Sequence, residues 1–461
     1  MAKKPVDKKS RKGAEESEEE QPQLEMALFQ GPLFDRVVDT KTHAKLIQSA
    51  LVAAKEMVSD AMRRRAHTIQ IEPREGRFAL RYTIDGAPYP AAALPGPRGM
   101  AMVQVLKLLA GLDPTERTQP QFGGLQLEFA DRKYELFVES TPVGKAERLR
   151  IKIFDVKLAL EKPQDIGMPD SIKDRIREIT AHRSGVLAVC GPPDSGATTL
   201  SIVAVHTVDP YLYQVFNMSD LRGRKLINVS NFTPEAGHDL EMSFDRIIRR
   251  EADVLFLDPL RSPEAAQTIF QYADRLSFIL EVPANTPFEA LSKLMEWVGV
   301  DMVLRGLKGI LTQKLIRKLC KDCKQAYRPN PALLKKLGLS EQTTVLYRAP
   351  SPPAEDDPEA PTVEELCAPC GGSPWHGRVA ALELLEITDG MKEVIATGLS
   401  AEAVRRQMNA DGQVTLQKDA IRLVSEGITS LEEVQRVFSG GGKKRPPGKR
   451  PRPPGPPRVQ G

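Results

Sequence analysis

One short segment of this sequence constrains its fold more than any other. The apolar run GVLAVC (residues 185–190) leads into the stretch GPPDSGATT (191–199), which is followed by an apolar segment of helical character. A short, continuously apolar strand is typical of a parallel sheet with both faces covered. Similar runs follow at VLFLD (254–258) and LSFILEV (276–282), with helical segments between them. This alternation predicts a doubly wound α/β domain from about residue 165 to 318.

The stretch 191–199 lies where a phosphate-binding loop belongs, between a buried strand and a helix. Such a loop needs glycines so that backbone N–H groups converge on the phosphates, a Lys that reaches the β- and γ-phosphates, and a Ser or Thr for Mg²⁺. The lysine position holds Ala197. A turn of this composition also arises by chance between a strand and a helix, so the loop alone leaves both interpretations open. The positions that fit a nucleotide-binding loop are Gly191, Pro192, Ser195, Gly196, Thr198 and Thr199.

Two residues of this loop disfavour phosphate binding. Ala197 removes a positive charge, and Asp194 adds a negative one where anionic phosphates would lie. At separations of a few ångströms, each such change is worth about 1–4 kcal/mol. The helix N-terminus and its backbone N–H groups remain. The sequence therefore predicts weak binding of an anion or of ATP/Mg²⁺ at most, and no hydrolysis.

The rest of the chain divides by composition. Its 461 residues, 41% of them hydrophobic, suffice for about three domains at ~150 residues each. Segments with few apolar residues or with Pro/Gly-rich low complexity are expected to be disordered. The predicted parts outside the α/β core are a disordered tail (1–35), an α+β N-terminal domain (42–155), a cysteine-containing subdomain (319–378), a C-terminal helical region (379–438) and a disordered basic tail (439–461).

Charge and hydropathy narrow the range of partners. The seven Lys and Arg residues of segment 439–461 exceed the whole net charge of +4. The body of the protein is therefore not basic, and no nucleic-acid partner is expected. The tail itself could bind anionic lipid, nucleic acid or an acidic partner, or it could simply be solvated. No apolar run is long enough to span a bilayer, and the N-terminus lacks a signal peptide, so a cytoplasmic location is expected.

Four of the five cysteines form two CxxC pairs, Cys320 with Cys323 and Cys367 with Cys370. Two such pairs suit tetrahedral Zn²⁺, with each pair on one side of the ion. Four thiolates leave no open position for chemistry, so the predicted zinc site is structural. Buried free thiols or a redox pair are the alternatives. Cys190 lies in an apolar run and is expected to be an inert core residue.

Several segments, spread over nearly all of residues 42–438, share their patterns with one known family. They include LAGLDPTERTQPQFGG, STPVGKAERLRIKIFD, RREADVLFLDPLRSPEAAQ, the two cysteine segments and the closing DGQVTLQKDAIRLVSEGITSLEEVQRV. On these motifs the chain is identified as a member of the type II secretion and type IV pilus assembly ATPase family. The resemblance implies an α/β fold: a RecA-like P-loop NTPase core preceded by an α+β domain, with a tetracysteine zinc subdomain and C-terminal helices.

The same resemblance implies that most catalytic groups of the family are replaced. The family's loop lysine is Ala197, the glutamate after its second core strand falls on Pro259, and an N-terminal arginine falls on Phe137. A second arginine is Lys152, and the histidine motif reads LEVPAN at 280–285, without a histidine. Phosphoryl transfer depends on positioning and electrostatics, and losing one such group commonly costs about 10²–10³-fold in rate. The sequence therefore predicts a pseudo-ATPase.

Three other positions are less decisive. Asp220 lies in a weakly matching acidic motif, and Arg261 matches an arginine of the family. Asp258 ends the run VLFLD as the acid of a Walker B strand does, and that acid would hold Mg²⁺ through water. In the alignment, however, Asp258 occupies a glycine position of the family. It is therefore either a reassigned metal ligand or a turn residue at the end of the strand.

Taken together, these patterns predict a structural or regulatory subunit of a secretion or pilus motor. A weak or atypical ATPase that powers the same machinery, and a nucleotide- or anion-sensing binding module, are the alternatives. The resemblance implies a homo- or hetero-hexamer. It also implies an active ATPase paralogue and an inner-membrane platform protein as partners, through which the chain would be peripheral to the inner membrane.

Overall fold

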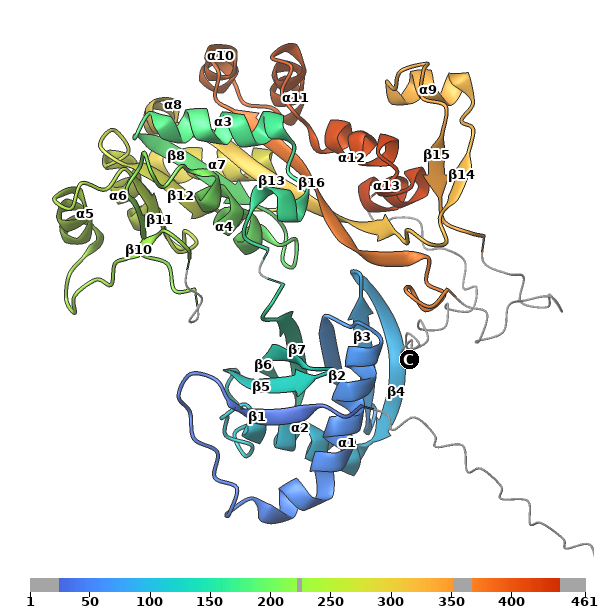
Figure 1. Cartoon of the computed structure of the whole chain (residues 1–461). Coiled ribbons are helices and arrows are strands. Elements are labelled where there is room, and N and C mark those ends of the chain that lie inside the picture. The colour runs from blue at the N-terminus through green and yellow to red at the C-terminus, as the bar shows by residue number, and fades with distance from the viewer. Residues whose placement is uncertain (1–24, 159, 222–225, 352–366, 440–461) are drawn as a thin grey trace, which may run out of the picture.

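The computed structural model describes residues 25–158, 160–221, 226–351 and 367–439 (Figure 1). The predicted tail residues 1–24 and 440–461, and most of the Pro-rich insertion, lie outside these described residues. The described part contains two seven-stranded sheets and one two-stranded sheet. Figure 1 shows two units, each built on one large sheet and lying one above the other.

The first large sheet is antiparallel throughout and belongs to what we call the N-terminal unit (residues 25–155). Its strand order is β1-β5-β6-β7-β2-β3-β4. Helices α1 (Ala44–Arg63) and α2 (Gly96–Leu109) pack against this sheet and share its core. Because successive side chains of a strand point to opposite faces, buried and less buried residues alternate along β3. The strands are β1 (Leu28–Pro32), β2 (Thr68–Arg74), β3 (Arg77–Ile84), β4 (Ala87–Pro95), β5 (Gln121–Phe129), β6 (Arg132–Val143) and β7 (Ala146–Asp155).

The start of this unit differs from the sequence-based expectation. Segment 1–35 is predicted to be a disordered tail, yet residues 28–32 form β1 and pair with β5. Ala27 is fully buried and its N–H donates to Ser59 Oγ at 2.8 Å, while Phe29 packs against the core. The prediction was wrong for these residues because composition was averaged over the whole segment. The charged runs end before residue 25, and the few apolar residues after them share a core that the other strands already form.

The second large sheet belongs to the core unit (residues 160–439). Its strand order is β10-β9-β11-β12-β8-β13-β16. The strands from β10 to β13 are parallel to their neighbours, and β16 is antiparallel to β13. The predicted α/β fold class is thereby confirmed. The strands are β8 (Gly185–Cys190), β9 (Val215–Asn217), β10 (Ser230–Asn231), β11 (Val254–Phe256), β12 (Ser277–Glu281), β13 (Leu307–Leu319) and β16 (Trp375–Glu386).

Helices cover both faces of this core sheet, and β8 lies between the two layers. All six residues of β8 are buried, which explains why the strand is apolar at every position. The 3₁₀ turn η1 (Pro163–Ile166), α3 (Asp170–Ala181) and α4 (Ala197–Thr207) pack on one face. The other face is covered by α5 (Leu240–Ile248), α6 (Pro263–Gln271), α7 (Pro287–Val298), α8 (Val300–Gly306), α10 (Asp389–Thr397) and α11 (Ala401–Ala410).

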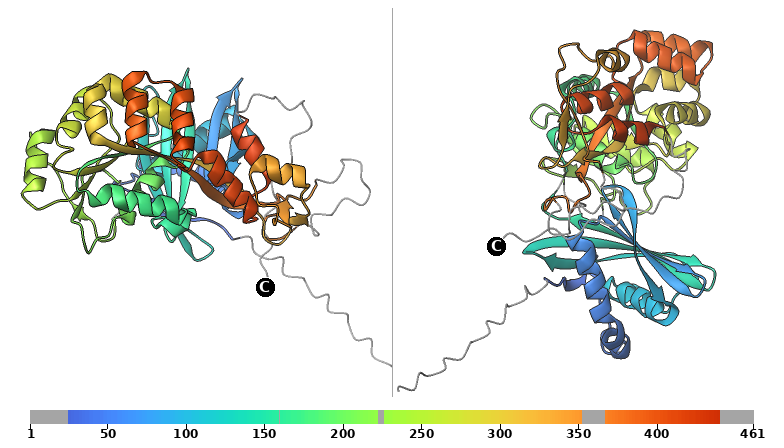
Figure 2. Two further views of the ribbon diagram at one scale, coloured as in Figure 1. Left: turned by 90° about the horizontal axis from the view of Figure 1, so that it is seen from above. Right: turned by 90° about the vertical axis from the view of Figure 1, so that its right-hand side faces the viewer.

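The remaining elements lie around the far ends of β13 and β16 (Figures 1 and 2). They are β14 (Gln325–Tyr327), α9 (Pro331–Leu337), β15 (Leu346–Arg348), α12 (Leu416–Ser425) and α13 (Leu431–Phe438). A small core of its own joins α12 and α13 to the two long strands and to β15. The carboxylate of Glu433, whose side chain is fully buried, fastens α13 to β13 through Arg317 at 2.6 Å and also binds Arg436.

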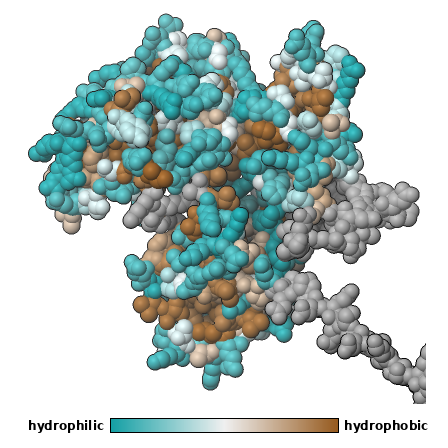
Figure 3. All heavy atoms as spheres, viewed as in Figure 1, coloured by the Kyte–Doolittle hydropathy of each residue, from teal (hydrophilic) through white to brown (hydrophobic). Residues whose placement is uncertain are grey.

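The surface differs between the two units. Figure 3 shows a largely hydrophilic core unit, whereas hydrophobic residues gather on the visible face of the N-terminal unit. Exposed apolar side chains of that unit include Leu28, Phe34 and Val37. None of the helices in the described ranges has the length and hydrophobicity that a bilayer span requires.

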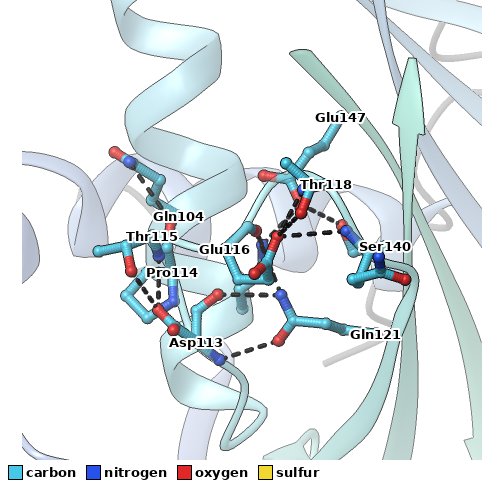
Figure 4. A network of polar contacts seen from close by, with 11 residues as sticks. Gln104, Asp113, Pro114, Thr115, Glu116, Thr118, Gln121, Ser140 and Glu147 are labelled. Atoms are coloured by element: carbon cyan, nitrogen blue, oxygen red, sulfur yellow. Dashed lines mark hydrogen bonds and ion pairs between the residues drawn. The ribbon is translucent and has the colours of Figure 1, made fainter. Parts of the chain in front are cut away.

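A fully buried ion pair links α2 to β7 inside the N-terminal unit. The side chains of Lys107 and Glu147 are both 0% exposed, and Nζ lies 2.6 Å from Oε1. Lys107 also donates to the main-chain carbonyl of Glu116, and Ser140 donates to the same carboxylate oxygen. Figure 4 shows Glu147 and Ser140 beside the loop that carries Glu116 and Thr118 and beside Gln121, which begins β5. The pair therefore connects a helix, two strands and the loop before β5.

We expect Lys107→Ala to lower the free energy of unfolding by about 3–5 kcal/mol, because it leaves a buried carboxylate without its cation. The double variant Lys107→Met/Glu147→Leu, which removes both charges, should recover much of this loss. Urea unfolding followed by circular dichroism measures the effect. Lys173→Ala, which removes an exposed pair with Asp170, is the control and should change stability by less than about 0.5 kcal/mol. A Lys107→Ala variant as stable as this control would contradict the prediction.

Candidate functional site

The loop of residues 191–196 connects β8 to α4 at the carboxyl ends of the parallel strands, as the sequence predicts. Both of its glycines lie where an added Cβ would press on the end of a polar side chain. A Cβ on Gly191 would lie 2.4 Å from Ser195 Oγ, and a Cβ on Gly196 would lie 2.6 Å from Gln313 Nε2. Gly196 also has φ +84°, in the left-handed region, directly before α4 begins. The loop thus keeps the compact path of a strand-to-helix anion-binding turn.

Neighbouring strands hold this loop from below. Gln313 of β13 donates from Nε2 to the Ser195 carbonyl at 2.8 Å, and Thr312 donates to the Cys190 carbonyl at 2.9 Å. The N–H of Gly191 donates to the Ala284 carbonyl, just after β12. In the described part of the chain, Ser195 Oγ and Gln313 Oε1 are buried without a hydrogen-bond partner. Hydrogen bonds with β13 and with the segment just after β12 therefore fix the loop backbone, while these two buried oxygens remain unpaired.

The loop contains no cation of its own, since residues 191–199 include neither Lys nor Arg. Ala197 begins α4 and packs in part against the apolar core beneath that helix. Pro192 lies at the start of the loop, and Thr198 and Thr199 lie in the first turn of α4, where Thr198 is exposed. A backbone nest without a cation can attract an anion only through its N–H groups and the helix dipole.

Asp194 instead brings cations from the N-terminal unit to the loop. Its carboxylate forms ion pairs with Arg150 and, at 3.5 Å, with Lys152, both on β7. Burial acts to raise the pKa of Asp194, but the hydrogen bond and charge of Arg150, together with Lys152, outweigh this and hold it below its usual value. Asp194 is therefore ionised at neutral pH. Lys152, which aligns with a family arginine, thus contacts the loop through the carboxylate of Asp194.

The two other aligned catalytic positions carry no charge. Phe137 of β6 is 7% exposed and stacks on Phe122 with ring centroids 6.1 Å apart. It also meets Phe154 edge-on at 5.4 Å. Pro259 follows β11 and has no side chain that could polarise water.

Asp258 also follows β11, and its side chain is engaged in a turn. Its Oδ1 accepts hydrogen bonds from Ser219 Oγ at 2.7 Å and from the N–H of Asp220 at 3.0 Å. It thereby ties the end of β11 to the chain leaving β9. This contact favours the interpretation of Asp258 as a turn residue at the end of a strand. Glu281 lies near enough that, after its own burial, the charge of Asp258 also raises its pKa.

Glu281 is a polar residue of this site that the sequence analysis did not single out. It ends β12 and pairs with Val189 of β8, level with the start of the loop. Burial raises its pKa, whereas contacts with the hydroxyls of Thr198 and Ser201 lower it. A single acid at the end of the apolar run LSFILEV was a usable signal. The sequence does not show, however, that β12 is the neighbour of β8. Carboxylate and hydroxyl oxygens of this kind are ligands that Mg²⁺ accepts.

The four paired cysteines converge at the ends of β13 and β16, as predicted. Their Sγ atoms all lie within 4.8 Å of one another. Cys320 and Cys367 are 3.7 Å apart, and so are Cys323 and Cys370. A tetrahedral ion with metal–sulfur bonds of about 2.3 Å places sulfurs ~3.8 Å apart, so the spacing fits a bound metal.

Electrostatics around the cysteines favour a bound cation. Burial first, and then the charge of Cys370, raise the pKa of Cys323. A metal ion would relieve this mutual repulsion of thiolates. Nearby, the ammonium group of Lys324 lies 4.0 Å from the centroid of the Tyr347 ring and donates to the Gly427 carbonyl. This lysine therefore connects the cysteine-bearing segment to β15 and to the chain just after α12.

Comparison with known proteins agrees with this arrangement. The model of the family described as "Type II/IV secretion system protein" matches residues 42–436. This chain belongs to that family. The family resemblance found in the motifs is thereby confirmed, and so is the fold that it implies.

Relatives within the type II/IV secretion system protein family have low identity but extensive coverage. The type IV pilus assembly ATPase PilB of Thermus thermophilus is 27% identical over 397 residues, which are 82% of this chain and 42% of that protein. Type II secretion system protein E of Dickeya dadantii is 27% identical over 416 residues, 88% of this chain and 78% of that protein. The chain thus matches less than half of the first relative and most of the second.

A solved structure supports the fold. The X-ray structure of the Legionella pneumophila ATPase DotB has a TM-score of 0.51 at 13% identity, and the match covers 85% of this chain and 96% of that one. At this identity the likeness concerns the fold alone. It agrees with an N-terminal antiparallel sheet followed by a mostly parallel core sheet.

We expect protein purified without chelator to contain about one metal ion per chain by inductively coupled plasma mass spectrometry. Cys323→Ser should lose most of this metal, because three thiolates hold the ion far less tightly than four. Cys190→Ala is the matched control, since this buried thiol is far from the cluster in the fold and lies in β8. Fewer than half an ion per chain in the unchanged protein would contradict a metal site.

Proposed function

We propose that this chain is a non-hydrolysing, ATPase-like subunit of a secretion or pilus motor, with a structural or regulatory role. One observation carries this proposal. The strand–loop–helix that would cradle phosphates is complete in backbone, but its lysine position is Ala197, and the two cations that β7 brings to the loop are paired with Asp194. A developing phosphate charge would meet no free cation from the loop.

Electrostatics indicate how large the loss should be. Phosphoryl transfer is stabilised almost wholly by positioned charge, and removing one such group costs about 10²–10³-fold in rate. The resemblance places such groups at Ala197, Pro259 and Phe137, none of which carries a charge. Phe137 is packed among aromatic rings, so a charged side chain from a neighbouring position could occupy its place only by disrupting that cluster. The losses act on the same transition state, so turnover should be negligible.

The tetracysteine site fits a structural role within the same proposal. We assign zinc to it, because four thiolates at this spacing form a closed tetrahedral site. Such an ion would fasten the end of β13 to the start of β16, and so keep the small subdomain attached to the core sheet. Cys320, Cys323, Cys367 and Cys370 would be the ligands.

The named relatives suggest the setting. One is a pilus assembly ATPase and another a type II secretion protein. By analogy, we propose that this chain forms a homo-hexamer that works beside an active ATPase paralogue, or a hetero-hexamer that contains the paralogue. This assembly would lie in the cytoplasm, against an inner-membrane platform protein. The absence of a nucleic-acid partner stays a prediction from the charge distribution.

A weak or atypical ATPase is the second candidate, and Glu281 is the observation in its favour. This acid lies beside Thr198 and near Asp258 at the mouth of the loop, and burial raises its pKa. The three side chains could hold Mg²⁺ and orient a water. The site would still need a cation to replace the missing lysine, and Asp194 already holds Arg150 and Lys152.

We expect this chain to release phosphate from Mg-ATP only at background level across a concentration series. The assay is run without and with the active paralogue, and the paralogue's own activity is subtracted. The matched controls are Thr198→Ala and Glu281→Gln, which remove the hydroxyl and the acid closest to the loop. Release that survives both changes comes from a contaminant. Release that both changes abolish would establish the weak ATPase and refute the proposed function.

A further inference from the structure

The contact between Asp194 and β7 joins the two units of the chain. Asp194 lies in the core unit, in a loop, with φ +64°. Its carboxylate reaches Arg150 and Lys152 in the N-terminal unit, 44 and 42 positions away in the sequence. A non-glycine residue in the left-handed region is uncommon, and Asp is one of the few that adopt it readily. The loop conformation thus directs this carboxylate towards β7.

The two cations on β7 lie on the sheet face that the helices do not cover. Leu149 and Ile151 are fully buried in the core under α1 and α2, so the alternating residues 150 and 152 point the other way. Arg150 is directly opposite Glu139 of β6, yet it pairs with Asp194. In the described structure, its Nε is buried and has no hydrogen-bond partner. The ion pair with Asp194 therefore leaves this buried N–H of the guanidinium unsatisfied.

A second contact fixes the units beside this one. The carboxylate of Asp85, in the turn after β3, accepts from the N–H of Gly377 at 2.9 Å and lies 3.8 Å from Arg65. Arg378 is adjacent, and burial lowers its pKa while Asp85 and Asp194 act in the opposite direction. The junction between the units thus contains more cationic side chains than carboxylates. This charge balance suits the binding of an anion.

Building on the non-hydrolysing loop proposed above, we propose that Asp194 is an internal anion that occupies the cations a phosphate would otherwise bind. Its carboxylate satisfies Arg150 and Lys152 while the loop is empty of ligand, and it repels any polyphosphate that approaches the loop N–H groups. The residue thereby sets the specificity of the site against phosphate. Removing its charge, and nothing else, should convert the junction into a polyphosphate site built from the loop and β7.

The test is Asp194→Asn, because Asn tolerates the left-handed backbone as well as Asp does and differs by one charge. Binding of inorganic tripolyphosphate without Mg²⁺, measured by isothermal titration calorimetry, should tighten at least about tenfold, as expected for removing one like charge at such a separation. Arg150→Gln/Asp194→Asn should bind no more tightly than the unchanged protein. A merely structural effect on the loop would not give tighter binding that depends on Arg150.

Asp170→Asn is the matched control, because it removes an exposed carboxylate of α3 that pairs with Lys173 in the same unit. It should bind tripolyphosphate as the unchanged protein does. If Asp194→Asn binds no more tightly than Asp170→Asn, the inference is overturned, whatever the turnover assay shows. If the unchanged protein hydrolyses ATP but Asp194→Asn still gains Arg150-dependent affinity, the proposed function fails and the internal anion stands.

Discussion

The site depends on the burial of β8 between two layers of helices. A strand covered on both faces must be apolar at every position, and each fully buried aliphatic side chain contributes about 1.5–3 kcal/mol. This burial aligns β8 with β12 on one side and β13 on the other. The loop that follows β8 therefore begins level with the end of β12, where Glu281 lies. Thr312 and Gln313 of β13 can bind the loop backbone at the same level.

The loop keeps its shape although its charges have changed. Gly191 and Gly196 remain where a side chain would collide, so the backbone path is preserved. Two positions differ in charge from what a phosphate-binding loop needs, since Ala197 supplies no cation and Asp194 supplies an anion. Shape and charge are thus separable in this protein: hydrogen bonds and packing maintain the turn, while electrostatics decide what it can bind.

The junction between the units shows how a single loop residue can influence a larger part of the molecule. Asp194 and Asp85 each bind groups across the boundary, one at the loop and one beside the cysteine-bearing end of β16. His67 lies half-buried at the same boundary, where desolvation and the charge of Arg378 lower its pKa to about 3. It is therefore neutral under ordinary conditions, and the positive charge of the junction rests on the arginines and Lys152. The N-terminal unit is held by electrostatic contacts more than by a shared apolar core.

Local pattern by itself determined the apolar strands, the loop between β8 and α4, the pairing of four cysteines and the family, because each depends on residue types at short, regular spacing. That residues 191–199 contain no lysine could also be read directly from the sequence. Only the tertiary structure decided what lies beside the loop. The order of strands places Glu281 next to Thr198, and the packing of the N-terminal unit brings Arg150 and Lys152 to Asp194. The predicted disordered tail extended too far, over β1, for the same reason. This strand is stabilised by pairing with residues about 100 positions away, and a short stretch of sequence does not contain those contacts.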